Sequence, residues 1–454
     1  MPTEVDASPP PSSHLSTLAR MGYSFTTAVG DIVDNSVAAG ASLIHILLLK
    51  HEDQFRLSIL DNGCGMDKAC LLDSMVIGCK DPRDDRAGSD LGRFGAGLKT
   101  ASFSQAKNLT VLSWQQGASS VSGAKWDTEL VKARNSWCLL ELTSEEAMEE
   151  LQNIVSPMGR SGSVVIWDQI NVLDAEDDPI SAEHIAGSMT QELHTYLGLH
   201  FHRFLESTLE IQVNGVRVKA IDPFLRDEPG YAEGPRELVR SKKGKVSIKA
   251  HTLPRPSSLK KETLELHGGA TAISEGQGLY LYRNKRLIAG GGWHGVARST
   301  ELNNLARIQI DITADMDNDW ETDVKKSRLS VPPKIKQVLR RITPAPISSS
   351  RKTHKYAGKV EEASALWLIR TNLREDEERT TYIPDTSNAR FRNIMSSLNA
   401  DDRRQLADYI LDLSKELPVR HIYATYAASP TQVQHASDLE KELEELERLL
   451  LNDG

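Results

Sequence analysis

The stretch DIVDNS, Asp31 to Ser36, places two carboxylates and a carboxamide inside a predicted helix. The helix spans about residues 16–40, because the apolar residues around DIVDNS repeat at helical spacing, and Ser24 stands where a cap is expected. Asp31 and Asn35 are four residues apart and therefore leave the same helix face, with Asp34 beside them. A carboxylate and a carboxamide there suit a water molecule and a divalent metal ion. Taken alone, the stretch also fits a solvated acidic face.

A second stretch, DNGCGMD (Asp61 to Asp67), directly follows two predicted strands at residues 43–49 and 55–60. Asp61 at a strand end can accept a hydrogen bond from an exocyclic amine. Gly63 and Gly65 allow the backbone to close on a flat ring. The same residues also fit an ordinary structural turn.

The third stretch is GSDLGRFGAGLKTAS, Gly88 to Ser102. Its glycines leave backbone N–H groups able to face an anion, and LKTASF after them begins a predicted helix, whose N-terminus favours phosphate. Lys99 adds a positive charge in the first turns of that helix. The stretch follows neither the Walker nor the Rossmann pattern.

In this order and spacing the three stretches resemble the GHKL ATPases, which include gyrase B subunits, heat-shock chaperones of that superfamily, MutL mismatch-repair proteins and MORC proteins. A fourth signature of the family, a Gly-Thr followed by strand residues, has a counterpart in Gly162-Ser163-Val164-Val165. Among the branches, GRFGAGLK and YRNKRLIAGG look closest to MORC and its bacterial relatives. The resemblance covers residues from about 20 to 207.

The resemblance implies an α+β protein. A disordered tail (1–15) precedes a Bergerat-type ATP-binding α/β sandwich (16–207), which is followed by a β-α-β transducer domain (208–345). The transducer is expected to open with LEIQVNGVRV, where Asn214-Gly215 predicts a hairpin. Polar and basic residues predict a linker at 346–360, and residues 361–454 are expected to be mostly helical. The leucines of the last helix, Leu439 to Leu450, fit either docking on the same subunit or a short coiled coil.

The resemblance also assigns a role to each motif residue, with ATP as the implied ligand. Asn35 would hold Mg²⁺, Asp61 would read the adenine amino group, and Met66 would pack on the ring. Ser163 would assist Asp61 through a water molecule, and residues 67–91 would form a lid. The remaining nucleotide-binding residues implied are Asp34, Gly63, Gly65, Gly92, Arg93, Phe94, Gly95, Ala96, Gly97, Leu98, Lys99 and Thr100.

Asp31 departs from the family pattern, since members that hydrolyse ATP carry a glutamate there as general base. Aspartate is one methylene shorter, which sets its carboxylate back by roughly 1.5 Å, and a misplacement of about 1 Å can cost on the order of a hundredfold in rate. A small helix shift, or Asp34 acting in its place, would compensate. We expect a slow ATPase; ATP binding with very rare hydrolysis is the alternative.

In MutL, gyrase and MORC the transducer lends a lysine to the γ-phosphate. The stretch DWETDVKKSRLSVPP, Asp319 to Pro333, falls where that lysine is expected. Lys326 is the first choice and Lys325 the second, and both also fit surface lysines at a strand end.

Composition limits the partners. A net charge of -9 argues against a constitutive nucleic-acid coat, although the basic runs Arg240–Lys249 and Lys334–Ile342 fit either a nucleic-acid channel or a solvated surface. No apolar run approaches the roughly 20 residues of a membrane span, the N-terminus lacks signal-peptide features, and the four cysteines lack CxxC pairing. We therefore expect no membrane and a cytoplasmic location with reduced thiols.

ATP in this superfamily commonly closes a dimer of N-terminal domains, here through the segment before Tyr23 and the lid. We expect an ATP-dependent homodimer that clamps DNA or a partner protein, in bacterial anti-phage defence by the MORC resemblance. The alternatives are a nucleotide-gated dimerisation module with negligible hydrolysis and a MutL-like DNA repair factor. His194, His200 and His202 do not have the spacing of a HExxH zinc site.

Overall fold

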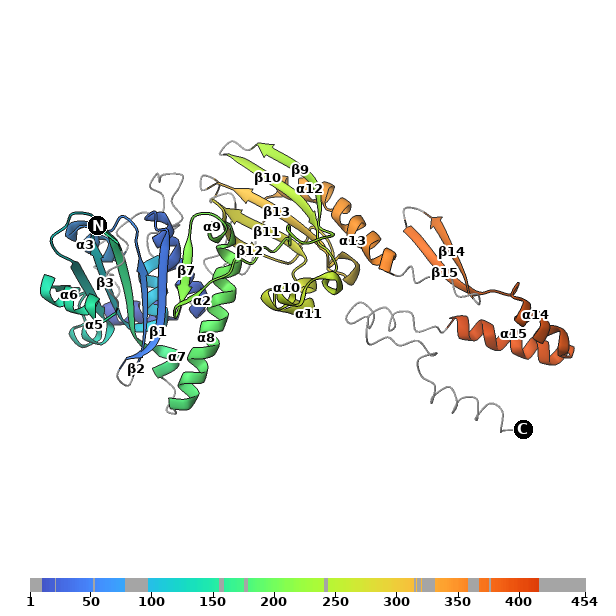
Figure 1. Ribbon diagram of the computed structural model, residues 1–454, viewed down its shortest axis with the longest axis horizontal. Helices are drawn as coiled ribbons and strands as arrows, with labels where there is room; N and C mark the ends of the chain where they lie inside the picture. Colours follow the sequence, from blue (N-terminus) through green and yellow to red (C-terminus); the bar gives the residue numbers. More distant parts are fainter. Residues whose placement is uncertain are drawn as a thin grey trace, which may run out of the picture. The chain divides into compact units, whose positions relative to one another are not determined.

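The computed structural model in Figure 1 describes residues 10–20, 22–51, 54–77, 97–154, 159–174, 179–240, 244–313, 316, 320, 331–357, 367–374 and 377–415. The chain divides into two compact units. The first comprises residues 1–299 and 305–347, and the second comprises residues 300–304 and 348–454.

The first unit contains an eight-stranded sheet with the order β5-β4-β3-β6-β2-β1-β7-β8. Neighbouring strands are antiparallel except β1 and β7, which are parallel. The strands are β1 (Leu43–His51), β2 (Gln54–Asp61), β3 (Ala106–Trp114), β4 (Ser122–Asp127), β5 (Leu140–Leu142), β6 (Gly162–Ile170), β7 (Glu210–Val213) and β8 (Val216–Arg217). The strands predicted at 43–49 and 55–60 are thus confirmed as β1 and β2.

Helices cover both faces of this sheet (Figure 1). On one face, Val29 and Ile32 of α2, Phe103 of α4 and Leu197 of α8 share one apolar cluster with the strands. On the other face, α6 packs against the sheet through Leu151. The helices are α1 (Pro11–Ala19), α2 (Phe25–Ala38), α3 (Lys68–Met75), α4 (Gly97–Gln105), α5 (Thr128–Arg134), α6 (Ser144–Gln152), α7 (Asn171–Asp174), α8 (Pro179–His200) and α9 (His202–Leu205). A mixed sheet with helices in this arrangement is consistent with the expected Bergerat-type sandwich.

The N-terminal segment differs from its prediction. Residues 11–15, expected in a disordered tail, belong to α1, which buries Leu15 and Leu18 in the main apolar cluster. The single helix predicted for 16–40 is divided, because Gly22 adopts a positive φ of 72° between α1 and α2. The predicted cap is confirmed: the Ser24 hydroxyl accepts a hydrogen bond from the Thr27 backbone N–H.

The stretch LEIQVNGVRV belongs to the first sheet rather than opening the next domain, because β7 pairs in parallel with β1. The boundary expected after residue 207 is therefore too early. Its hairpin is confirmed, with positive φ at both Asn214 (48°) and Gly215 (77°). The Asn214 side chain also accepts a hydrogen bond from the Leu48 N–H at 2.9 Å. A hairpin is a local signal, whereas the sheet it joins depends on distant residues.

The same unit contains a second sheet of five strands in the order β12-β11-β13-β10-β9. Helices α10 and α11 connect β10 to β11. Strand β13 lies between them, antiparallel to β10 and parallel to β11, so β10 and β11 run in opposite directions and do not form the predicted β-α-β unit. Helix α12 packs Ile335 and Leu339 into the apolar cluster on one face of the sheet. The elements are β9 (Ala232–Arg240), β10 (Lys245–Thr252), η1 (Pro256–Ser258), α10 (Lys261–Leu266), α11 (Gly269–Glu275), β11 (Gly278–Arg283), β12 (Arg286–Gly290), β13 (Ala306–Ile312) and α12 (Pro333–Ile342).

Beyond α12 the described residues form the predicted C-terminal helices and, in addition, one hairpin. The elements after α12 are α13 (Pro344–Ala357), β14 (Trp367–Arg374), β15 (Glu377–Pro384), α14 (Ala389–Ser397) and α15 (Ala400–Lys415), whereas η2 (Glu301–Asn303) lies between β12 and β13. The expected linker at 346–360 is helical as far as Ala357, and the Ser350 hydroxyl donates to the Leu302 carbonyl at 2.6 Å. An antiparallel hairpin, β14–β15, lies within the region expected to be mostly helical. Its sequence contains Trp, Ile, Thr and Tyr, which favour strands. Leu439 to Leu450 lie outside the described residues.

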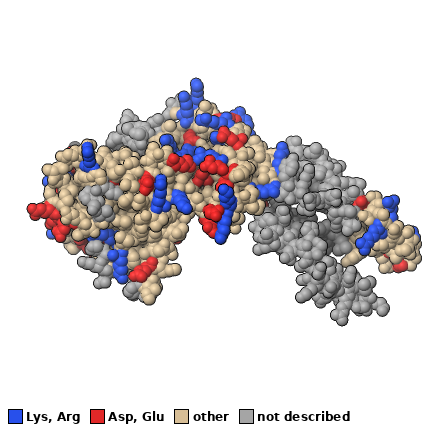
Figure 2. All heavy atoms as spheres, viewed as in Figure 1, with Lys and Arg blue, Asp and Glu red and all other residues tan. Residues whose placement is uncertain are grey.

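Both basic runs of the sequence fall on the second sheet and its helix. Arg341 of α12 donates to the Glu237 carboxylate of β9, and the Lys249 ammonium lies 2.6 Å from the Glu233 carboxylate. Figure 2 shows basic and acidic side chains mixed on the face that it draws. These contacts offset part of the positive charge of the two runs. Among the described helices, none is long and apolar enough to cross a membrane.

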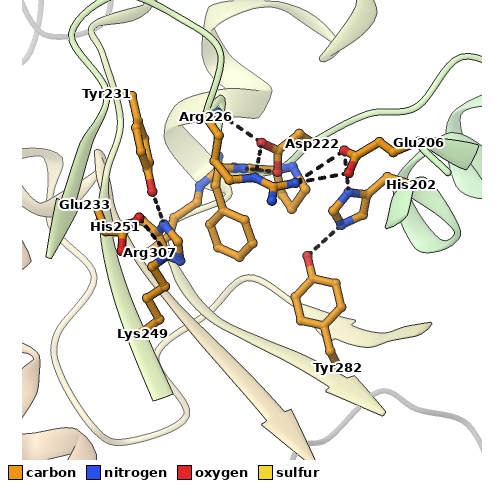
Figure 3. A network of polar contacts seen from close by, with 12 residues as sticks. His202, Glu206, Asp222, Arg226, Tyr231, Glu233, Lys249, His251, Tyr282 and Arg307 are labelled. Atoms are coloured by element: carbon orange, nitrogen blue, oxygen red, sulfur yellow. Dashed lines mark hydrogen bonds and ion pairs between the residues drawn. The ribbon is translucent and has the colours of Figure 1, made fainter. Parts of the chain in front are cut away.

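His251 of β10 is fully buried in the second sheet domain. Its ring stacks on Phe224 with centroids 4.1 Å apart, and its Nδ1 lies 2.8 Å from the Tyr231 hydroxyl (Figure 3). Burial, aided by the positive charge of Lys249, lowers the pKa of His251 to about 4. The neutral ring is therefore part of the folded structure.

His251 should make the folded protein sensitive to mild acid. Its folded pKa lies below the ordinary value of about 6.5, so the unfolded chain binds the proton first and stability falls as the pH drops from 6.5 towards 4. We expect a loss of about 2 kcal/mol between pH 7.5 and pH 5 from this group. Thermal unfolding over this range should show a smaller acid-induced loss in His251→Gln than in the wild type. His184→Gln, at an exposed position of α8, is the control, and equal pH profiles for the two variants would contradict the expectation.

Candidate functional site

Helix α2 directs consecutive polar side chains to different surroundings. Asp34 and Ser36 are buried, Asn35 is exposed and Asp31 is partly exposed. This follows from helix geometry, because each residue is rotated by 100° from the one before it. Residues four positions apart therefore point in nearly the same direction. The structure therefore brings Asp31 and Asn35 to one accessible face, as predicted, while Asp34 points elsewhere.

Asp31 is held by a residue that the sequence analysis did not select. The Tyr23 hydroxyl shares a hydrogen bond with the Asp31 carboxylate, and burial together with the negative charge of Asp31 raises the pKa of Tyr23. Tyr23 is itself fixed by α4, because the Gln105 side-chain amide donates to the Tyr23 carbonyl at 3.1 Å. No periodic or motif signal marks Tyr23 in the sequence.

Asp61 lies at the end of β2 with both carboxylate oxygens bonded. One oxygen accepts from the Ser36 hydroxyl of α2 and the other from the Gly63 N–H, each at 2.9 Å. Burial outweighs these hydrogen bonds and raises the pKa of Asp61. The β2–β6 register places Ser163 directly opposite Asp61, as the family signature implies. Ser36 thus fastens α2 to the strand end where adenine is expected.

The turn after Asp61 is packed too closely for side chains at its glycines. Gly65 has a φ of 68°, and a Cβ there would lie 2.0 Å from the Trp114 carbonyl oxygen. A Cβ on Gly162 would lie 2.2 Å from the Asp61 carbonyl oxygen. Between them, the Met66 N–H donates to the Ser113 hydroxyl at 2.8 Å, leaving the Met66 side chain partly buried. The backbone of the DNGCGMD stretch is thus fixed against the ends of β3 and β6.

The described part of helix α4 runs from Gly97 and contains the LKTASF run that the third stretch predicted to be helical. A Cβ on Gly97 would lie 3.9 Å from Asp31 Oδ2, so the Asp31 carboxylate is next to the start of α4. Lys99 is buried, and its ammonium donates to the Ser74 carbonyl at 2.7 Å, a contact between α4 and α3. Thr100 is buried and Leu98 is partly buried. Gly97 of α4 is therefore close to the Asp31 carboxylate.

Several predicted residues lie outside the part of the chain that the structure describes. These are the lid beyond residue 77 and the residues Gly92, Arg93, Phe94, Gly95, Ala96, Lys325 and Lys326.

Asp34, predicted among the nucleotide-binding residues, forms a buried ion pair instead. Its Oδ1 accepts a hydrogen bond from Nε of Arg286, the first residue of β12, at 2.8 Å. This pairing makes Asp34 a poor substitute for Asp31 as a base. The sequence analysis singled out YRNKRLIAGG, which contains Arg286, but gave it no role.

Two further sequence expectations concern metals and thiols. His202 is buried and its Nε2 lies 2.9 Å from the Tyr282 hydroxyl. Within the described residues no group of three His, Cys, Asp or Glu side chains is arranged to hold a metal ion. Cys64, Cys70 and Cys138 are free thiols, and Cys79 lies outside the described part.

Comparison with known proteins agrees with this geometry. Residues 23–156 match the family described as histidine kinase-, DNA gyrase B-, and HSP90-like ATPase, a range that contains all three stretches. No curated protein matches the chain. Residues 23–156 therefore carry a GHKL-type ATPase domain, and domains of this kind generally bind ATP together with Mg²⁺. The match does not distinguish the MORC branch from the others.

Asp61→Asn should separate nucleotide binding from stability. The asparagine amide keeps one oxygen to accept from the Gly63 N–H, but its NH2 group would face the amino group of adenine, which is also a donor. Calorimetric titration should therefore show an ADP affinity about 10–100-fold weaker than that of the wild type. Near neutral pH the variant should melt at the same or a higher temperature, because the buried charge is gone. That gain should shrink on acidification, since the raised pKa lets the wild-type carboxyl protonate and recover stability. Asp227→Asn, at an exposed turn position outside the three stretches, is the matched control, and equal ADP affinities for the two variants would refute the assignment.

Proposed function

We propose that this protein is a slow, Mg²⁺-dependent ATPase whose ATP-bound form dimerises and acts as a clamp on DNA or a partner protein. The observation that carries the proposal is the arrangement around α2: Asp31 and Asn35 share its accessible face, Asp31 lies at the start of α4, and Ser36 joins α2 to Asp61. These are the carboxylate, carboxamide, helix terminus and adenine acceptor that ATP hydrolysis by this family requires.

The residues present fit the expected ligand. The N–H groups at the start of α4 suit phosphate, and the Asp61 carboxylate suits the adenine amino group. Asn35 would hold Mg²⁺, which prefers oxygen ligands and commonly shares substrate phosphates with few protein groups. When bound, the ion would supply positive charge against the phosphate oxygens.

Asp31 would orient the attacking water and accept its proton. The hydrogen bond from Tyr23 would help to orient this carboxylate. Because the Asp31 side chain is one methylene shorter than glutamate, it would reach the water poorly, which supports slow turnover. Lys326, or failing it Lys325, would complete the phosphate site.

The clamp and its setting rest on the family resemblance. Dimerisation would use the outer side of α1, since Leu15 and Leu18 pack inward on their own domain, together with the lid. The basic residues of β10 and α12 support a DNA client, whereas their ion pairs with Glu233 and Glu237 support a protein partner. A role in bacterial anti-phage defence follows from the MORC-like stretches alone, and MutL-like repair is the second candidate.

The decisive experiment measures phosphate release from ATP by the purified protein, with Asn35→Ala as control, alongside its mass by light scattering with a non-hydrolysable ATP analogue. Turnover abolished by Asn35→Ala, together with analogue-dependent dimers, would support the proposal. Dimers without turnover would favour a nucleotide-gated binding module. The absence of both turnover and analogue-dependent dimers would overturn the proposal. Anisotropy of labelled duplex DNA, measured with and without the analogue, separates a DNA client from a protein client.

The length of the residue at position 31 should control the rate. Asp31→Glu should raise kcat by about tenfold or more, because it restores the reach of the carboxylate. Asp31→Asn should abolish turnover and leave ADP affinity unchanged. Phosphate release and ADP titration check both. A rate for Asp31→Glu at or below wild type would show that carboxylate reach does not limit turnover.

A further inference from the structure

Arg286 is a fully buried arginine at the join between the two sheets of the first unit. It is the first residue of β12 and follows a turn in which Asn284 and Lys285 both have positive φ, 46° and 73°. Turns with two such residues suit the twist of a tight hairpin, and this one connects β11 to β12. The hairpin delivers the guanidinium to the side of α2.

The guanidinium is held from several directions. Nε donates to Asp34 of α2 at 2.8 Å, Nη1 to the Leu287 carbonyl at 2.7 Å and Nη2 to the Tyr196 hydroxyl of α8 at 3.3 Å. The Arg286 guanidinium carbon also lies 4.0 Å from the centre of the Phe201 ring. Burial alone would lower the pKa of Arg286, but the charge of Asp34 keeps it above its ordinary value. The planar fork of arginine suits this set of bonds in a way that a lysine ammonium does not.

Gly30 gives an independent sign that this contact shapes α2. It lies inside the helix, next to Asp31, where glycine is unfavourable relative to alanine. A Cβ at Gly30 would lie 2.7 Å from Tyr196 Cε1 and 3.1 Å from Arg286 Nη2. The α2 backbone is therefore pressed directly against the two side chains that fix its direction.

We infer that Arg286 is a positioning residue through which the second sheet domain sets the orientation of α2, and with it Asp31 and Asn35. Asp34 is one helical turn from Asp31 and adjacent to Asn35, so a shift at Asp34 moves both. The second sheet thereby regulates the nucleotide site through a residue that touches no nucleotide. The inference rests on the proposed function for its effect on turnover.

Arg203 provides a matched control. It extends from α9 to the same sheet, where Nη1 lies 2.5 Å from the Asp311 carboxylate and the guanidinium carbon lies 3.5 Å from the Tyr282 ring centre. In Figure 3, His202 of α9 reaches Tyr282, and Glu206, which follows α9, reaches Arg226. None of the recorded Arg203 contacts involves α2. Arg203 therefore joins α9 to the second sheet without fixing α2.

The test compares Arg286→Lys with Arg203→Lys in the full chain. Both keep the charge and lose the planar fork, so both lower the melting temperature. Arg286→Lys alone should reduce kcat by about tenfold, because α2 is misplaced by a fraction of an ångström, while ADP affinity stays within about threefold of wild type. Hydrogen exchange should be about tenfold faster in α2 of Arg286→Lys, and unchanged in α2 of Arg203→Lys.

The inference fails if the two variants slow turnover equally, or if α2 exchange is equal in both. If the wild-type protein does not hydrolyse ATP, the proposed function fails on its own, and the exchange comparison still tests the contact. If Arg286→Lys does not fold, Gly30→Ala takes its place, since it displaces Tyr196 and Arg286 without removing any charge. A Gly30→Ala protein with wild-type kcat and α2 exchange would also overturn the inference.

Discussion

The fixed position of α2 is the constraint on which the rest of this site depends. Two buried contacts from adjacent parts of the helix hold it: Ser36 donates to Asp61 in the first sheet, and Asp34 pairs with Arg286 in the second. Removing one partner of a buried pair leaves an uncompensated charge, at a typical cost of about 3–5 kcal/mol. Together with the buried apolar side chains of α2, these two contacts fix the direction in which Asp31 and Asn35 face.

This arrangement connects the strand end where adenine is expected with the second sheet through helix α2. Asp61, expected at the adenine edge, bonds Ser36, and two residues earlier the same helix meets Arg286. Both contacts belong to the same rigid helix, and a packed interior transmits small displacements rather than absorbing them. A displacement at the Asp61 contact would therefore reach the Arg286 contact, and the reverse. Nothing between the two ends needs to unfold or rearrange for one to affect the other.

Local patterns in the sequence predicted much of this site. The spacing of Asp31 and Asn35 predicted the helix face that they share. Ser24 predicted the helix cap, and the run LKTASF predicted helix α4. These features depend on residues within one or two turns of each other. The direction of Asp34 was not predictable in this way, because its partner is more than 250 positions away. Lys99 shows the same limit, since only tertiary packing reveals that its ammonium meets the Ser74 carbonyl.

The second domain was harder to predict for the same reason. Asn214-Gly215 marks a hairpin wherever it lies, but only the pairing of β7 with β1 assigns that hairpin to the first sheet. Tyr23 and Tyr196 carry no motif, although both contact residues of the α2 site. The YRNKRLIAGG stretch was conspicuous as a pattern, yet its meaning required the position of Arg286 in three dimensions.

The contrast between Asp31 and its buried neighbours has an evolutionary consequence. Asp34 and Ser36 are inside the packed structure, so their replacement threatens folding, whereas the partly exposed Asp31 is under much weaker packing restraint. Descendants of such a protein can therefore gain or lose catalytic speed by a single exchange at this position while the nucleotide-responsive framework is inherited intact. Fast and nearly inert relatives would then share one architecture and differ only in the timing of their cycle.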